Sequence, residues 1–522
     1  IAMFYTTAVT VKMLPYDNKA EFAVVIDMPE GTALPATTNI AREMAERLRE
    51  IPEITAMQTY AGTARPFDFN GMVRHYYLRN DPWLAEIQVQ LTHKIKRSRS
   101  SHELAEQARA LLTPLAREVG AKLTVAEMPP GPPVVQAVVA EIYGPDAATR
   151  RQVASDMTAM FEATDGLADV DNYISQPYQA WRFVIDTQKA STKGVSPSTV
   201  IETLSTAMGQ YKITDVREGS ALEPTWIVIE APLALRANPK ALSDLPVPAP
   251  GGTTLPLAEL GSFERIQEDP IIYHKDLRPL EYVVGDAVGR LGAPIYPMAK
   301  IDEKLADYVT PDGQTMSGTM MGKPADNGLS AFEWAGEWTV TYETFRDMGA
   351  AFAVALVLIY MLVVGMFGNF LVPAIIMAPI PLTLLGIVPG HWLVSVLTGS
   401  NAYFTATSMI GFIALAGLIV RNSILLVDFA VEEVRQGVDV REAVLRSCKA
   451  RTRPIMITAF ALIGGASVIL TDPIFQGMAI SLMFGVFVST VLTLLVIPLG
   501  TVSASKSLRA LAMARNAEAD QA

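Results

Sequence analysis

The chain has few of the residues that build covalent or catalytic sites. Its 522 residues include a single cysteine, Cys448, so no disulfide can form within it. It has no glycine-rich nucleotide loop, no nucleophile elbow and no HExxH-type metal site. The formal net charge of −11 argues against nucleic acid as a partner. We therefore expect neither an enzyme nor a nucleic-acid-binding protein, and we expect no cofactor.

Formal charge is nearly absent from one long stretch. Between residues 349 and 427, Arg421 is the only formally charged residue. It lies inside the apolar segment 406–430, which is long enough for a bilayer crossing of about 20 residues. A guanidinium in hydrocarbon costs about 2.5 to 3.5 kcal/mol, so it usually faces a bundle interior and pairs with a carboxylate. Ala414 and Gly417 share its helical face and would let another helix approach. The pattern predicts an intramembrane ion-pair site; the alternative is that Arg421 snorkels to the cytoplasmic interface.

Apolar residues dominate the C-terminal third of the chain. This pattern predicts a transmembrane domain at 348–503 with five helical spans, at about 348–366, 369–388, 404–430, 454–470 and 478–499. Lysines and arginines gather in the loop 431–453 and in the tail, 504–522. The positive-inside rule places both segments in the cytoplasm. The soluble part precedes an odd number of spans before the first basic loop, so we expect it outside, which is the periplasm if the source is a Gram-negative bacterium.

The soluble part shows an interrupted repeat. Residues 12–131 have the order β-α-β-β-α-β, the split βαβ arrangement, and Ser100 and Glu103 predict a capping box in it. The same pattern returns in 132–178 and 269–340, where a strand at 314–319 is expected to close it, around an inserted subdomain at 179–268. The predicted fold class is an α+β membrane protein with repeated ferredoxin-like subdomains followed by a helical bundle. Residues 1–11 resemble the end of a truncated transmembrane helix, so we expect the chain to be part of a larger protein.

Two further features suggest candidate sites. Phe67 and Phe69 lie in a glycine-bearing loop between two strands, where aromatic rings can contact an apolar ligand or fill a core. Thr458 shares a helical face with Ala461 and Gly465. Its hydroxyl could bond a buried ion pair, or it could bond the backbone carbonyl four residues earlier.

Several motifs, in this order and at these spacings, resemble one family over nearly the whole chain. They are KMLPYD at 12–17, VIDMPEGT at 25–32, IDTQKA at 185–190, GVS at 194–196, GLIVRNSILLVDF at 417–429 and RTRPIMIT at 451–458. The chain resembles the permease subunit of resistance–nodulation–division (RND) efflux pumps, closest to the hydrophobe/amphiphile drug-efflux branch.

The resemblance implies an architecture and partners. Members of the family have two homologous halves, each with six spans and a large periplasmic loop, and this chain resembles the C-terminal half. The segment 179–268 is similar to the part that docks toward an outer-membrane channel. The family implies a homotrimer in the bacterial inner membrane, working with a periplasmic adaptor protein, an outer-membrane channel and the missing N-terminal half. It implies multidrug resistance by antiport, driven by the proton gradient.

The resemblance also implies roles for individual residues. In the family, a lysine followed by asparagine in the tenth span pairs with two aspartates of the fourth, and Arg421 and Asn422 occupy that position here. Because arginine does not release its proton in proteins, the proton would have to be carried by carboxylates outside this chain. Thr458 and Arg451 match the family's eleventh-span threonine and the arginine at the start of that span. Phe67 and Phe69 fall near its aromatic drug-binding loop.

Two other functions stay open at this point. A non-transporting assembly or regulatory subunit would use the soluble domains only for docking. An RND pump for metal ions would share the architecture but use methionine or carboxylate ligands. The 23 methionines are scattered, with Met320 and Met321 as the only adjacent pair, and form no ligand cluster in the sequence. The exported substrate is not determined by these patterns.

Overall fold

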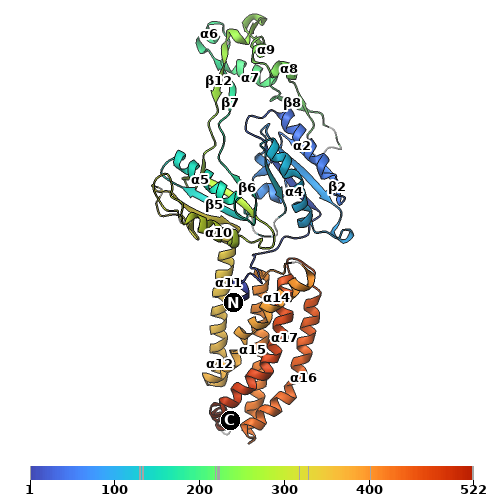
Figure 1. Cartoon of the computed structure of the whole chain (residues 1–522), viewed down its shortest axis with the longest axis vertical. Coiled ribbons are helices and arrows are strands. Elements are labelled where there is room, and N and C mark those ends of the chain that lie inside the picture. The colour runs from blue at the N-terminus through green and yellow to red at the C-terminus, as the bar shows by residue number, and fades with distance from the viewer. Residues whose placement is uncertain are drawn as a thin grey trace. The chain divides into compact units, whose positions relative to one another are not determined.

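The computed structural model describes residues 2–128, 131, 134–217, 219, 224–316, 318–326, 328–399 and 401–519 (Figure 1). The chain forms two compact units. The first comprises residues 1–28, 32–174 and 272–522, and the second comprises 29–31 and 175–271. Residue 1 of the expected truncated helix and residues 520–522 of the expected tail lie outside the described residues.

The first sheet contains strands β1 (Glu21–Asp27), β2 (Ile54–Ala61), β3 (Leu84–Leu91) and β4 (Lys122–Ala126), in the antiparallel order β2-β3-β1-β4. Helices α2 (Leu34–Leu48) and α4 (Ser101–Glu118) bury Met44, Leu104 and Leu112 in the sheet's core. The predicted capping box is confirmed, because Ser100 Oγ accepts from the Glu103 amide and the Glu103 carboxylate accepts from the Ser100 amide.

The second sheet repeats this pairing order. Its strands β5 (Val138–Tyr143), β6 (Leu167–Asn172), β14 (Arg278–Ala287) and β16 (Ala331–Gly336) pair antiparallel in the order β6-β14-β5-β16. Phe161, Phe332 and Trp334 fill its core against α5 (Ala147–Glu162) and α10 (Ile295–Leu305). The expected closing strand at 314–319 was misplaced. Of the residues that the structure describes at 314–319, Gly318 and Thr319 form the strand β15, and β16 is the strand that pairs with β5.

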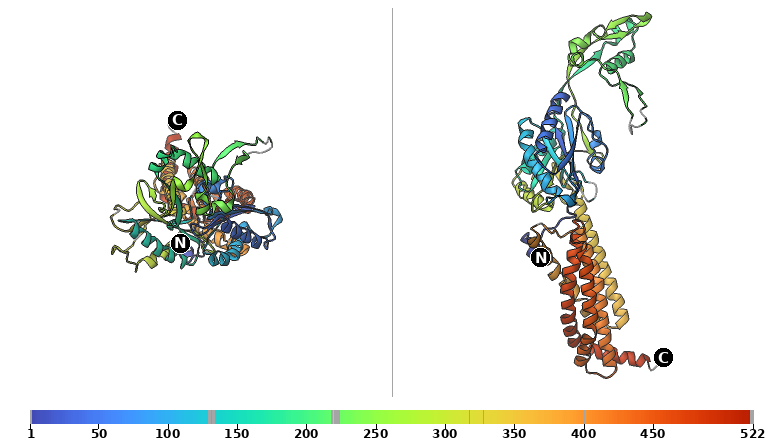
Figure 2. Two further views of the ribbon diagram at one scale, coloured as in Figure 1. Left: turned by 90° about the horizontal axis from the view of Figure 1, so that it is seen from above. Right: turned by 90° about the vertical axis from the view of Figure 1, so that its right-hand side faces the viewer.

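Helices make up most of the rest of the first unit (Figure 2). They are α11 (Glu337–Phe367), α12 (Leu371–Met377), α13 (Pro379–Leu382), α14 (Leu384–Thr398), α15 (Ala406–Arg435), α16 (Val440–Ser467), α17 (Gln476–Ser503) and α18 (Ser505–Ala519). Helix α17 packs against α14, α15 and α16. Helix α11 touches α15 through Phe352 and Phe412, whose ring centroids are 5.0 Å apart.

Four helical segments of the described chain are long and apolar enough to cross a membrane: 337–367, 371–398, 406–435 and 476–503. The predicted span at 454–470 falls in α16, which does not meet the same criterion. Helix α16 runs without a break from a basic segment into its apolar half, and only its last 14 residues, 454–467, are free of charge. That stretch is shorter than the about 20 residues of a bilayer crossing. Helix α11 contains the predicted span at 348–366 and begins eleven residues before it, because it follows directly on β16.

The second unit is built around the pair β7 (Gln179–Ile185) and β12 (Gly261–Gln267). Its small core contains Val195, Val200, Val247, Leu257 and Leu260. The other regular elements of the unit are α6 (Thr187–Thr192), α7 (Pro197–Ala207), β8 (Lys212–Asp215), β9 (Trp226–Val228), α8 (Leu233–Arg236), α9 (Pro239–Ser243), β10 (Pro246–Pro248) and β11 (Thr254–Pro256).

The first unit also contains several short elements. They are α1 (Ala2–Tyr5), α3 (Phe69–Val73), β13 (Tyr273–Lys275) and the 3-10 turns Tyr76–Leu78 and Lys94–Lys96.

Candidate functional site

Arg421 lies on an uncovered face of α15. Ala414, Gly417 and Arg421 are all exposed in this chain, and a methyl group added at Gly417 would meet no atom within 4 Å. The opposite face is buried against the rest of the bundle, where Leu415 and Ile419 are at most 1% exposed. The predicted face of small residues around the guanidinium therefore exists, and no described element of this chain covers it.

No described residue forms an ion pair with Arg421, and no described residue bonds the Asn422 side chain. The carboxylate partner predicted for Arg421 is therefore not supplied by the part of the chain that the structure describes. Asn422 is half-buried next to it.

Arg451 and Thr458 lie on α16, the helix that packs beside the Arg421 helix. The Arg451 guanidinium stands over the ring of Phe429 in α15, 5.5 Å from the ring centroid. Thr458 Oγ1 donates to the Ile455 carbonyl, three residues earlier, at 2.9 Å. The hydroxyl is thus engaged with its own helix, as in the backbone alternative, although with the carbonyl at i−3 and not at i−4.

Phe67 and Phe69 lie in the long connection between β2 and β3. Phe67 is 68% exposed and Phe69 is 36% exposed, so neither ring fills a core. Phe67 lies beside Tyr77, with 5.9 Å between ring centroids. Met72 and Leu78 of the same connection are also exposed. The connection therefore presents an apolar, partly aromatic surface that a ligand could contact.

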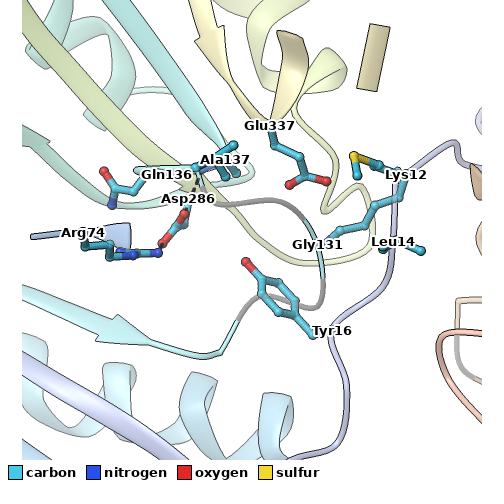
Figure 3. Close-up of a pocket in the computed structure, with 11 residues that line it drawn as sticks. Lys12, Leu14, Tyr16, Arg74, Gly131, Gln136, Ala137, Asp286 and Glu337 are labelled. Atoms are coloured by element: carbon cyan, nitrogen blue, oxygen red, sulfur yellow. Dashed lines mark hydrogen bonds and ion pairs between the residues drawn. The ribbon is translucent and has the colours of Figure 1, made fainter. Parts of the chain in front are cut away.

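The structure also shows a cavity with charged side chains in its lining, which the sequence patterns did not reveal (Figure 3). Arg74 Nη2 lies 3.3 Å from Asp286 Oδ2, and the Ala137 amide donates to Asp286 Oδ1 at 3.2 Å. Lys12 is 5% exposed, and its ammonium lies 4.4 Å from the centroid of the Tyr16 ring. The only sequence signal for this cavity was a lone lysine directly after the apolar segment 1–11.

Burial shifts the protonation of two groups in this cavity. It lowers the pKa of Lys12, although the charges of Glu337, Glu127 and Asp286 act in the opposite direction. Burial also raises the pKa of Tyr16 well above its usual value, and the charge of Asp286 adds to that shift. The cavity therefore favours an uncharged phenol, and a charged Lys12 needs a nearby carboxylate to offset its burial.

Comparison with known proteins places these features in a family. The model of the AcrB/AcrD/AcrF family matches residues 1–500. The swarming motility protein SwrC of Bacillus subtilis is 24% identical over 365 residues, which is 69% of this chain and 32% of SwrC. The cobalt-zinc-cadmium resistance protein CzcA of Cupriavidus metallidurans is 24% identical over 371 residues, with the same two shares.

One solved structure shows the same fold. The X-ray structure of a heavy metal efflux pump, crystal form II, aligns with a TM-score of 0.70 and 20% identity, covering 95% of this chain and 48% of that one. The chain thus spans about half the length of that solved pump and about a third of these curated relatives. Because the family model covers most of the sequence, the chain belongs to the AcrB/AcrD/AcrF family of RND efflux permeases, whose members are transporters and not enzymes.

Proposed function

We propose that this chain is the C-terminal half of a proton-driven RND permease, an antiporter that exports amphiphilic small molecules from the bacterial inner membrane. The observation that carries the proposal is the exposed, small-residue face of α15 around Arg421. A guanidinium facing lipid costs about 2.5 to 3.5 kcal/mol, so this face calls for a covering helix with a carboxylate. The missing half of the permease would supply that helix.

Proton coupling would work through the charge of Arg421. An unprotonated carboxylate on the covering helix would pair with the guanidinium, whereas a protonated one would release it. Arginine keeps its own proton, so it acts as the fixed cation of the pair. Asn422 follows Arg421 directly in α15. Arg451 of α16 contacts Phe429 of α15 and so holds the two helices together, and Thr458 also lies on α16. The movement released by protonation would reach the soluble domains.

The remaining architecture follows the same proposal. The equal pairing order of the two sheets supports reading them as copies of one ferredoxin-like module, at 12–131 and at 132–178 with 269–340. The second unit, whose main segment 175–271 nearly coincides with the expected insertion at 179–268, would be the docking subdomain. We place the two sheets of the first unit, and the whole second unit, in the periplasm. The apolar half of α16 would cross the membrane as a fifth span. The working assembly would be a trimer with an adaptor and an outer-membrane channel.

The exported class is best supported as amphiphilic molecules. Phe67 and Tyr77 offer exposed rings beside one another, and Phe69 in the same connection is also exposed. Such rings suit apolar ligands better than bare ions. Among the relatives, TtgB of Pseudomonas putida is a toluene efflux pump membrane transporter, 25% identical over 288 residues. Metal ions are the second candidate, because CzcA and the solved pump carry metals in their names.

The test uses the intact permease that contains this chain. Arg421→Ala should abolish resistance to exported drugs while the protein stays in the membrane at its normal level. Arg441→Ala, an exposed arginine at the start of α16, is the matched control and should leave resistance unchanged. Unchanged resistance in Arg421→Ala would refute the coupling role. If Arg421→Ala instead lost tolerance to zinc and cobalt and kept its drug resistance, the exported substrates would be metal ions.

A further inference from the structure

The cavity that contains Lys12, Arg74, Asp286 and Glu337 lies beside the first turn of α11. Its lining includes Lys12 from the N-terminal segment and Glu337 from the first turn of α11 (Figure 3). In the figure both side chains point into the same space.

The backbone around Lys12 is bound to the start of α15. The Lys12 amide donates to the Phe404 carbonyl at 3.1 Å, and the Phe404 amide donates to the Thr10 carbonyl at 2.8 Å. The Ala406 amide donates to the Met13 carbonyl at 3.1 Å. The intervening Thr405 caps α15, the helix that carries Arg421. Lys12 is therefore tied by short backbone bonds to the N-terminus of that helix.

Glu337 is tied to the second sheet in a similar way. It follows Gly336, the last residue of β16, without any intervening loop. The Glu337 amide donates to the Ala137 carbonyl at 3.1 Å, beside the start of β5. Helix α11 thus continues directly from the sheet, and a displacement of either one moves Glu337.

Within the cavity, Glu337 is the carboxylate left for Lys12. Asp286 is already held by Arg74 and by the Ala137 amide. Neither Lys12 nor Glu337 has an ion-pair partner within 4 Å among the described residues. Burial lowers the pKa of Lys12, and the charge of Glu337 opposes that shift more than the charges of Glu127 and Asp286 do. The cavity volume of about 40 Å³ is enough for at least one water, so a solvated pair fits between them.

We propose that Lys12 and Glu337 form a water-bridged charge pair. The pair fixes the position of the start of α15 relative to the end of β16 and the start of α11. The pair positions the Arg421 helix against the second sheet and so transmits movement between them during transport. This role rests on the proposed function. Lys12 is a positioning residue: it acts through Glu337 and through the backbone of residues 404–406, and it contacts no proton carrier or substrate.

The pair is tested first without transport, in the purified intact permease. We expect Lys12→Gln and Glu337→Gln each to lower the midpoint of thermal unfolding, because each leaves one buried charge unpaired. The double variant should lose clearly less than the sum of the two single losses. Additive losses would show that the two charges do not interact and would overturn the proposal.

The role in transport is tested with variants that keep or remove the positive charge of Lys12 while the side chain stays similar in length. We expect Lys12→Met to reduce drug export at least tenfold at normal membrane levels, and Lys12→Arg to retain most of it. Lys94→Met, at an exposed lysine, is the control and should export normally. Normal export by Lys12→Met would overturn the transmitting role. If instead Arg421→Ala alone exported normally, proton coupling through Arg421 would fail, while the unfolding cycle would still decide whether the pair exists.

Discussion

Replacing Gly336 with alanine should destabilise the protein at the joint between β16 and α11. Gly336 has φ of 82° and ψ of −143°, a backbone conformation that residues with a Cβ rarely adopt. An added Cβ would lie 2.5 Å from the Gln136 carbonyl oxygen, 3.0 Å from that of Ala137 and 2.9 Å from a methyl of Val139. The first two neighbours are backbone atoms of the segment leading into β5, so they cannot move aside cheaply.

The expected loss combines two effects of similar size. Holding alanine in this conformation costs about 1 to 3 kcal/mol. Forcing a methyl into a filled space costs about 1 to 3 kcal/mol more. We therefore expect Gly336→Ala to lower the free energy of unfolding by about 2 to 6 kcal/mol, a large share of the about 5 to 15 kcal/mol that stabilises a typical domain.

The assay compares two glycine variants in the intact, detergent-solubilised permease. Gly365→Ala, in the same helix α11, is the control, because an added Cβ there meets nothing within 4 Å. We expect Gly365→Ala to unfold at or slightly above the wild-type midpoint and Gly336→Ala to unfold well below it. Equal midpoints for the two variants would refute the reasoning, since they would show that the joint accommodates a side chain.

Two further predictions concern side chains of α4, His102 and Arg109. The hydrogen bond from His102 to Glu127, at 2.7 Å, raises the pKa of His102 above its usual value near 6.5, although burial opposes the shift. The stabilisation that this hydrogen bond adds is therefore complete below about pH 6.5 and is lost as the pH rises through the raised pKa of His102. His102→Gln should lower the unfolding midpoint more at pH 6 than at pH 9. An equal effect at both pH values would contradict the prediction. Arg109 pairs with Asp169 at 2.7 Å, and that carboxylate is 2% exposed. Arg109→Leu should cost about 3 to 5 kcal/mol by leaving a buried charge unpaired, and Arg109→Leu with Asp169→Asn should recover part of the loss in the same thermal assay.

Local sequence was sufficient where the determining interaction is local. The capping box of Ser100 and Glu103 needs only residues three positions apart, and the start of α4 was predicted from them. Helix α15 was predicted from a continuous apolar run, and its exposed small-residue face from helical spacing. The motifs from 12 to 458 predicted the family that the comparison then showed.

Tertiary structure was needed where a partner lies far along the chain. The strand that closes the second sheet was placed at 314–319, but β16 takes that position, because pairing with β5, nearly 200 residues earlier, decides it. The span at 454–470 was expected to begin after the basic loop at 431–453. One continuous helix, Val440–Ser467, instead contains most of both ranges.

The sequence by itself determined the family, the apolar helices and the solitary charge of Arg421, because composition and short spacings carry that information. Only the tertiary structure decided that Lys12, Arg74, Asp286 and Glu337 share one cavity. These four residues come from segments up to 325 positions apart, from Lys12 to Glu337, and nothing in their local patterns distinguishes them from solvated surface charges. Burial brings them together, and burial is a property of the folded chain that short-range patterns do not encode.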